Sequence, residues 1–183
     1  MSRAVAFLRA INVGGHTVRM EQLRQLFEAM GLTGVETYIA SGNVVFDANG
    51  ATARALETQI EAHLRVSLGY DVATFIRSEA ELAVIASYQP FPPEQLAEAA
   101  ALNIAFVSES LAGPAVEKLL ALQTEIDAFH VHGREIYWLC HKKQSESTFS
   151  NAVLEKTLRL KATLRGVNTI QKLVEKFSFR ESL

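Results

Sequence analysis

The sequence predicts an α+β protein made of two related α/β subdomains, each similar to a ferredoxin-like unit. In the first half, strand-like and helix-like apolar patterns alternate in the order βαββαβ. In the second half the order is βαββα plus an extra C-terminal helix. A proline-rich segment between them would interrupt a helix or an inner strand. We therefore expect subdomains at residues 1–88 and 100–183, joined by a linker at 89–99.

The first half contains four apolar runs rich in β-branched and aromatic residues. We expect strands at residues 4–8, 35–40, 44–46 and 72–76. Between them, apolar residues recur at helical spacing in two segments, around Leu23 and Phe27 and around Ile60 and Leu64. A glycine suited to a helix C-terminus follows each segment.

The second half repeats this order less regularly. A strand is expected at residues 102–107, a helix opens at Gly113-Pro114, and a hairpin joins residues 127–132 to 135–140. Two further helices are expected, one at about residues 147–158 and one around Leu173. Alternation along the hairpin puts Phe129 and Trp138 on a core face and His130, His132, Glu135 and Tyr137 on the other.

Composition indicates a soluble globular protein, with 49% apolar and 21% charged residues. No apolar run approaches the roughly 18 residues that a membrane span requires, so we expect no membrane association. Cys140 is the single cysteine, which excludes an internal disulfide and favours a cytoplasmic location. Its place in the alternation, beside Trp138, predicts a buried and inert thiol.

Charge is distributed unevenly along the chain. Residues 1–140 carry 9 Lys and Arg against 16 Asp and Glu, whereas residues 141–183 carry 9 against 4. A basic tail can attract an anionic partner, or it can be the solvated face of a helix. A sequence pI near 6.2 argues against a dedicated nucleic-acid binder. Tyr38 and Tyr137 could stack bases, but the basic-aromatic RNA-binding signature is absent, so nucleic acid is not an expected partner.

Polar residues follow the first and second strands of the first half. Because a crossover helix joins these two strands, they should run parallel and end at the same edge of the sheet. The candidate ligand-binding residues there are Arg9, Asn12, Gly14, Gly15, Ser41 and Asn43. Backbone N–H groups beside an arginine and a helix start attract anions. Alternatively, the glycines make only a tight turn, Asn12 bonds to the loop and Arg9 pairs with a carboxylate.

Other chemistry finds less support in the sequence. The glycine spacing matches neither a dinucleotide-binding nor a Walker motif, so we expect no cofactor. His130 and His132 lie on one face of an exposed hairpin, but no Cys/His set completes a metal site, so no metal is expected. Ser41 could be a nucleophile, with His16 as the one candidate base, but no recognised motif pairs them.

Several motifs in the chain resemble those of the DUF1697 family, a bacterial family of unknown function. Residues 9–15 read RAINVGG and residues 37–46 read TYIASGNVVF, where the family typically reads LRGINVGG and TYIQSGNVVF. Residues 150–156 (SNAVLEK) and 163–173 (TLRGVNTIQKL) resemble the family patterns TNAxLEKxLG and TTRNWNTVxKL. The resemblance implies two α/β subdomains related to the ferredoxin-like fold and no established activity.

The chain departs from the family patterns at two places. Ala10 replaces the usual glycine, and Gly166-Val167 stand where the family has Asn-Trp. Arg165, Asn168 and Thr169 still match, and we expect them to form a third wall of the ligand site.

We therefore expect a binding protein for a small anionic or polar ligand, held in a cleft at the loop after the first strand and the following hairpin turn. Alternatives are an enzyme of unnamed reaction using the same cleft, or a protein or nucleic-acid interaction module. The oligomeric state should be a monomer, or a weak homodimer formed by pairing of an edge strand.

Overall fold

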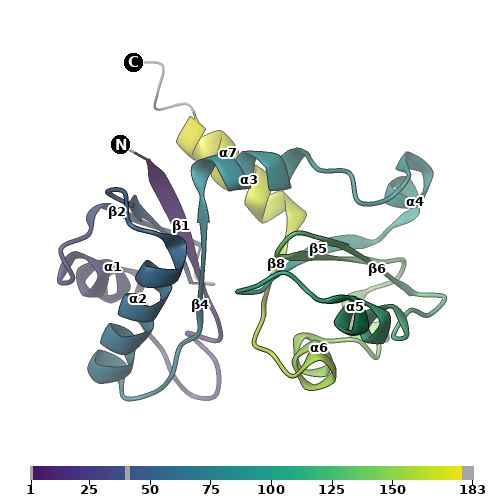
Figure 1. The fold of residues 1–183 in the computed structure, drawn as a ribbon, viewed down its shortest axis with the longest axis horizontal. Coiled ribbons are helices and arrows are strands. Elements are labelled where there is room, and N and C mark those ends of the chain that lie inside the picture. Colours follow the sequence, from purple (N-terminus) through teal and green to yellow (C-terminus); the bar gives the residue numbers. More distant parts are fainter. Residues whose placement is uncertain (1, 40–41, 179–183) are drawn as a thin grey trace. The chain divides into compact units, whose positions relative to one another are not determined.

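The structure is a computed structural model, and it describes residues 2–39 and 42–178 (Figure 1). The chain divides into two compact units, Met1–Val84 and Ile85–Leu183, which are described separately below. Among the described residues, no helix is both long and apolar enough to cross a lipid bilayer.

Unit 1 has the βαββαβ order predicted from the sequence, followed by a helix that extends past its last residue. Its sheet has the strand order β2-β3-β1-β4, and every neighbouring pair is antiparallel. The elements are β1 (Arg3–Leu8), α1 (Met20–Glu28), β2 (Thr33–Tyr38), β3 (Asn43–Asp47), α2 (Ala53–Leu68), β4 (Thr74–Ser78) and α3 (Glu79–Ser87).

The core of unit 1 lies between one face of this sheet and helices α1 and α2. Phe27 of α1 and Ile60 of α2 are fully buried in the same apolar cluster as Phe46 of β3. Burial of each such side chain contributes about 1.5–3 kcal/mol. Helix α2 ends as predicted, with Gly69 in the left-handed conformation at φ 82°.

Three glutamates cover the outer edge of unit 1's last strand. Glu61 and Glu57 of α2 accept hydrogen bonds, both of 2.9 Å, from the backbone N–H groups of Thr74 and Ile76. Glu81 of α3 accepts one of 2.8 Å from the N–H of Ser78, and its own N–H donates one of 3.2 Å to Ser78 Oγ, which makes a capping box. Alternate N–H groups of a strand point to the same side, so these carboxylates occupy the donors that a further strand would need.

Unit 2 repeats the same sheet topology, with the strand order β6-β7-β5-β8. The predicted fold class is therefore confirmed. The elements are α4 (Pro93–Glu98), β5 (Ala101–Phe106), α5 (Gly113–Leu120), β6 (Asp127–His132), β7 (Glu135–Cys140), a 3₁₀ turn (Gln144–Glu146), α6 (Asn151–Leu158), β8 (Thr163–Gly166) and α7 (Val167–Ser178).

Among the described residues, β8 is the one strand that the sequence did not predict. It makes unit 2 a second complete βαββαβ arrangement followed by α7, rather than βαββα plus a helix. The four residues of β8, TLRG, contain no apolar run that would indicate a strand. In the sequence they were noted only as part of a motif that resembles the family pattern. Pairing with β5, from Phe106 to Asn103, holds these residues extended.

Side-chain hydrogen bonds organise the region around hairpin β6–β7. Asp127 is buried and accepts hydrogen bonds of 2.7 Å from the indole N–H of Trp138 and from the Ser147 hydroxyl. Helix α6 begins after its N-cap Ser150, three residues later than the start expected near residue 147. Cys140 is buried as predicted, and burial raises the pKa of its thiol.

The proline-rich segment expected as a linker contains helix α4, which Pro93 opens. Just before it, the Tyr88 ring stacks on His132 with 4.1 Å between centroids, and its hydroxyl lies 2.7 Å from His130 Nε2. Phe91 also packs against His130. Tyr88 and Phe91 thus pack on one face of β6.

The covering of β4 yields a first prediction. Glu57 is 2% exposed, and Glu57→Ala would leave the N–H of Ile76 buried without an acceptor. We expect a loss of about 1–3 kcal/mol of stability and faster hydrogen exchange at Ile76. The control is Arg54→Ala, because Arg54 is exposed and its Nη1 lies 3.8 Å from Glu57 Oε2. This substitution removes the ion pair and leaves the hydrogen bond to Ile76 in place. Equal effects of the two substitutions would show that the ion pair, not the backbone hydrogen bond, matters.

Candidate functional site

The β1–α1 loop and the β2–β3 turn meet at one edge of unit 1's sheet. Strands β1 and β2 are both antiparallel to β3 between them, so they run parallel as expected. The N–H of Leu8 donates a 2.8 Å hydrogen bond to the carbonyl of Gly42. We call this region, residues 9–19 with Gly42 and Asn43, the loop–turn edge.

Gly42 fits closely against the loop. A Cβ atom at this position would lie 2.8 Å from Ile11 Cγ2 and 3.1 Å from Leu8 Cβ, and the backbone has φ +81°. Both the contact and the left-handed conformation require glycine. Ile11 is 2% exposed, so this contact forms part of the core.

A third segment, the α2–β4 loop, braces the loop–turn edge. The N–H of Arg9 donates a 2.9 Å hydrogen bond to the carbonyl of Ala73, and the Tyr70 hydroxyl donates one of 3.1 Å to that of Ile11. The ring of Tyr70 also stacks on His16, with 3.9 Å between centroids. Sequence reasoning missed Tyr70, because a single aromatic residue after a helix matches no pattern.

Two of the predicted ligand-binding amides hold the backbone in place. Asn12 Oδ1 accepts a 2.7 Å hydrogen bond from the N–H of Val18, which closes the loop on itself. Asn43 is fully buried, and its Nδ2 donates a 2.9 Å hydrogen bond to the carbonyl of Tyr38. The alternative considered for Asn12, a bond to loop backbone, is therefore observed, and Asn43 has a similar role in the turn.

Gly14 and Gly15 are the open part of the loop–turn edge. Both are exposed, with φ +68° and +84°, and nothing lies within 4 Å of a Cβ built on either. Within the described part of the chain, neither N–H group has a hydrogen-bond acceptor. Arg9, five residues before Gly14, is half-buried. Arg19 is the N-cap residue of α1, and its side chain makes no capping hydrogen bond. Ser41 lies outside the described residues.

The remaining predicted site residues belong to unit 2. Arg165 lies on β8 and is 7% exposed; its Nη1 donates hydrogen bonds of 2.8 Å to Thr163 Oγ1 and to the carbonyl of Leu164. Burial lowers the pKa of Arg165 to about 10. Asn168 and Thr169 fall in the first turn of α7. Their contribution to a shared ligand site stays a prediction.

A second cluster of polar aromatic residues lies on hairpin β6–β7. Tyr137 is fully buried, its hydroxyl has no hydrogen-bond partner among the described residues, and burial raises its pKa. Burial and the neighbouring His132 lower the pKa of His130. His132 is exposed as expected, whereas His130 is half-buried. The expectation of an open Tyr137 face was wrong, because Tyr88 packs against Tyr137. No group of three or more metal-ligating side chains forms among the described residues.

Comparison with known proteins places these features in a family. Residues 1–137 match the family described as "Protein of unknown function (DUF1697)". The chain belongs to the DUF1697 family. The match includes the whole loop–turn edge, whereas the C-terminal motifs at residues 150–156 and 163–173 lie beyond it. No curated protein matches the chain.

A solved structure with a similar fold is that of the conserved bacterial protein SP0830 from Streptococcus pneumoniae. The TM-score is 0.74 with 24% sequence identity, and the similarity covers 95% of this chain and 97% of that one. At this identity, the comparison supports the fold of the chain alone.

The close fit of Gly42 yields a second prediction. Gly42→Ala should destabilise unit 1 by about 2–4 kcal/mol, because it adds a steric clash to the cost of a left-handed alanine. Gly50→Ala is a matched control, since Gly50 has φ +79° and open space around its Cβ position. Urea unfolding of both variants separates the cost of the steric clash from the cost of a left-handed alanine. Equal losses of stability would show that glycine is needed at residue 42 only for its left-handed backbone conformation and not for its close contact with Ile11 and Leu8.

Ala10, the first departure from the family pattern, yields a third prediction. Its φ of +54° is unfavourable for any residue with a Cβ atom. Ala10→Gly should therefore stabilise the protein by about 0.5–1 kcal/mol. Ala51→Gly, at an exposed residue without positive φ, should instead destabilise slightly. A lower thermal midpoint for Ala10→Gly would contradict this account of the loop.

Proposed function

We propose that this DUF1697 protein binds a small anionic ligand at the loop–turn edge of unit 1. The observation that carries the proposal is the exposed pair Gly14 and Gly15, whose neighbouring N–H groups lack acceptors within the described residues. Successive backbone N–H groups in a turn form a concavity that favours anions. Both residues adopt left-handed conformations that favour glycine, and glycine has no side chain that could cover these donors.

Local charge supports an anion rather than a cation. Residues 9–20 contain Arg9 and Arg19 but no Asp or Glu. The first acidic residue after the loop, Glu21, is ion-paired with Arg24, which holds the pKa of that carboxyl below its usual value. The start of α1, immediately after the loop, adds the partial positive charge of a helix N-terminus.

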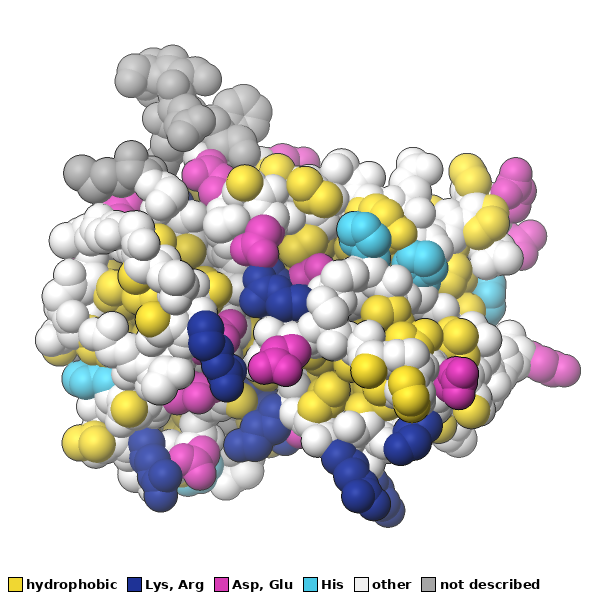
Figure 2. Space-filling model, in the orientation of Figure 1, with side chains coloured by type: hydrophobic (Ala, Val, Ile, Leu, Met, Phe, Trp, Pro, Cys, Tyr) yellow, Lys and Arg dark blue, Asp and Glu magenta, His cyan; other side chains and the backbone are white. Residues whose placement is uncertain are grey.

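The bracing of the loop supports a preformed site. Hydrogen bonds from Tyr70 to Ile11, from Val18 to Asn12 Oδ1 and from Leu8 to Gly42 fix the backbone on both sides of the glycine pair. A preformed site loses less conformational entropy when it binds. On the described part of the face in Figure 2, basic and acidic side chains are interspersed rather than gathered into one basic surface. That distribution favours a small ligand over nucleic acid.

Titration calorimetry with inorganic phosphate and small phosphate esters tests the proposal. Arg9→Gln should weaken binding about tenfold, because a charge-assisted hydrogen bond contributes about 1.5–3 kcal/mol. Arg54→Gln is the matched control, since Arg54 lies in the first turn of α2 with its side chain 71% exposed. Salt should weaken binding to the wild-type protein. No binding of any probe, or equal binding by both variants, would refute an anion site that uses Arg9.

A further inference from the structure

Unit 2 contains a pocket at the position that corresponds to the loop–turn edge of unit 1. Its volume is about 260 Å³, and it lies between the β5–α5 loop and the loop before β8. In the shared topology, these two loops correspond to the β1–α1 loop and the α2–β4 loop. The pocket involves none of the residues of the proposed anion site.

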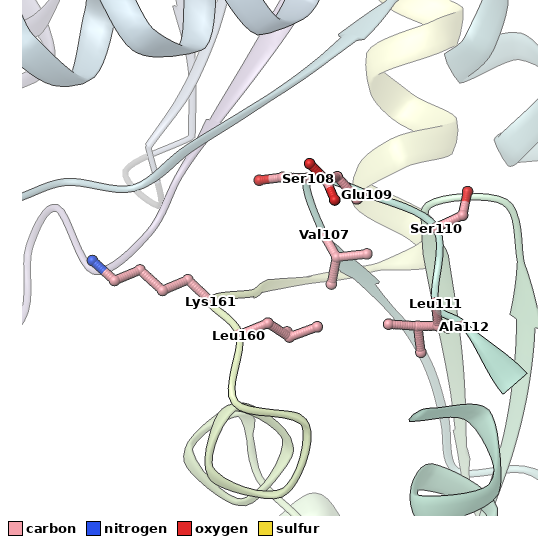
Figure 3. A pocket seen from close by; sticks show the side chains of 8 residues that line it. All are labelled: Val107, Ser108, Glu109, Ser110, Leu111, Ala112, Leu160 and Lys161. Atoms are coloured by element: carbon pink, nitrogen blue, oxygen red, sulfur yellow. The ribbon is translucent and has the colours of Figure 1, made fainter. Parts of the chain in front are cut away.

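The pocket walls are aliphatic. Figure 3 shows the side chains of Val107, Leu111 and Leu160 pointing into a common space from two different loops. Val107 is 1% exposed, and the two leucines are half-buried. These walls can enclose an aliphatic group but offer it no hydrogen bond.

The polar atoms of the pocket lie along its rim. Ser108, Glu109 and Ser110 follow Val107 directly, and their polar tips lie above the aliphatic walls (Figure 3). Lys161 also borders the pocket, but its side chain extends away from the walls. The carboxylate of Glu109 can only accept hydrogen bonds, and the serine hydroxyls can also accept them. The rim therefore suits a group that donates hydrogen bonds.

The internal repeat explains why this space is open in unit 2. Helices α2 and α6 both end in a left-handed residue, Gly69 at φ 82° and Arg159 at φ 54°. In unit 1 the next residue is Tyr70, which reaches the opposite loop. In unit 2 the next residue is Leu160, whose shorter side chain has no polar atom to bond to that loop. The corresponding space between the loops is the pocket.

We infer that this pocket binds a small aliphatic amine, with its alkyl group between Val107, Leu111 and Leu160 and its ammonium at Glu109. The volume lies below the roughly 300–1,000 Å³ of pockets for drug-sized ligands, so the ligand should have fewer than about ten non-hydrogen atoms. A carboxylate of the same shape would meet the like charge of Glu109.

Three probes with the same branched five-carbon skeleton test this inference: 3-methylbutylamine, 3-methylbutanol and 3-methylbutanoate. Titrations followed by the methyl NMR signals of Val107, Leu111 and Leu160 report binding in the pocket itself. The amine should bind about three- to fivefold more tightly than the carboxylate, as expected for an exposed ion pair. Glu109→Gln should remove that preference. Glu117→Gln, at an exposed residue of α5, should keep it.

A second variant tests the pocket by filling it. Leu160→Tyr introduces the residue that bridges the loops in unit 1, and it should abolish binding of all three probes in a protein that still folds. Thermal unfolding checks that the variant is folded. Binding that survives in folded Leu160→Tyr, a preference for the carboxylate, or probe-induced shifts confined to other residues would each overturn the inference.

Discussion

The contact of Gly42 with Leu8 and Ile11 is the constraint on which the loop–turn edge depends. It joins the end of β1 to the start of β3 at a distance that no side chain allows. Because Ile11 is thereby held in the core, the loop beyond it must leave the sheet in a fixed direction. Asn12 then closes the loop on Val18, and Gly14 and Gly15 remain as its exposed crest.

The two units show how one topology can support different sites. Both have the same strand order, and both bring the loop after the first strand close to the loop before the last one. In unit 1 Tyr70 bridges these loops, so the remaining chemistry is that of exposed backbone donors. In unit 2 Leu160 leaves an aliphatic pocket with Ser108, Glu109 and Ser110 along its rim. A single side chain after the helix thus accounts for much of the difference.

The sequence predicted most of the fold, because apolar periodicity and glycine punctuation are local signals. It missed β8, whose four residues are extended through pairing with β5 rather than through their own pattern. It found the loop–turn edge from topology, but it could not assign roles there. Asn43 is buried and Asn12 bonds inward, and such orientations depend on distant partners. The same holds for Tyr70 and Glu57, whose partners lie 59 and 19 residues away in the chain.

Anion binding by the glycine pair is tested most directly by amide NMR of uniformly ¹⁵N-labelled protein titrated with inorganic phosphate. The N–H signals of Gly14 and Gly15 should move downfield in a saturable manner, because a hydrogen bond to an anion deshields the amide proton. Gly50 and Gly69, at other turns, should stay unchanged. Unmoved Gly14 and Gly15 signals at high phosphate concentration, or equal shifts at all four glycines, would contradict an anion site at the loop–turn edge.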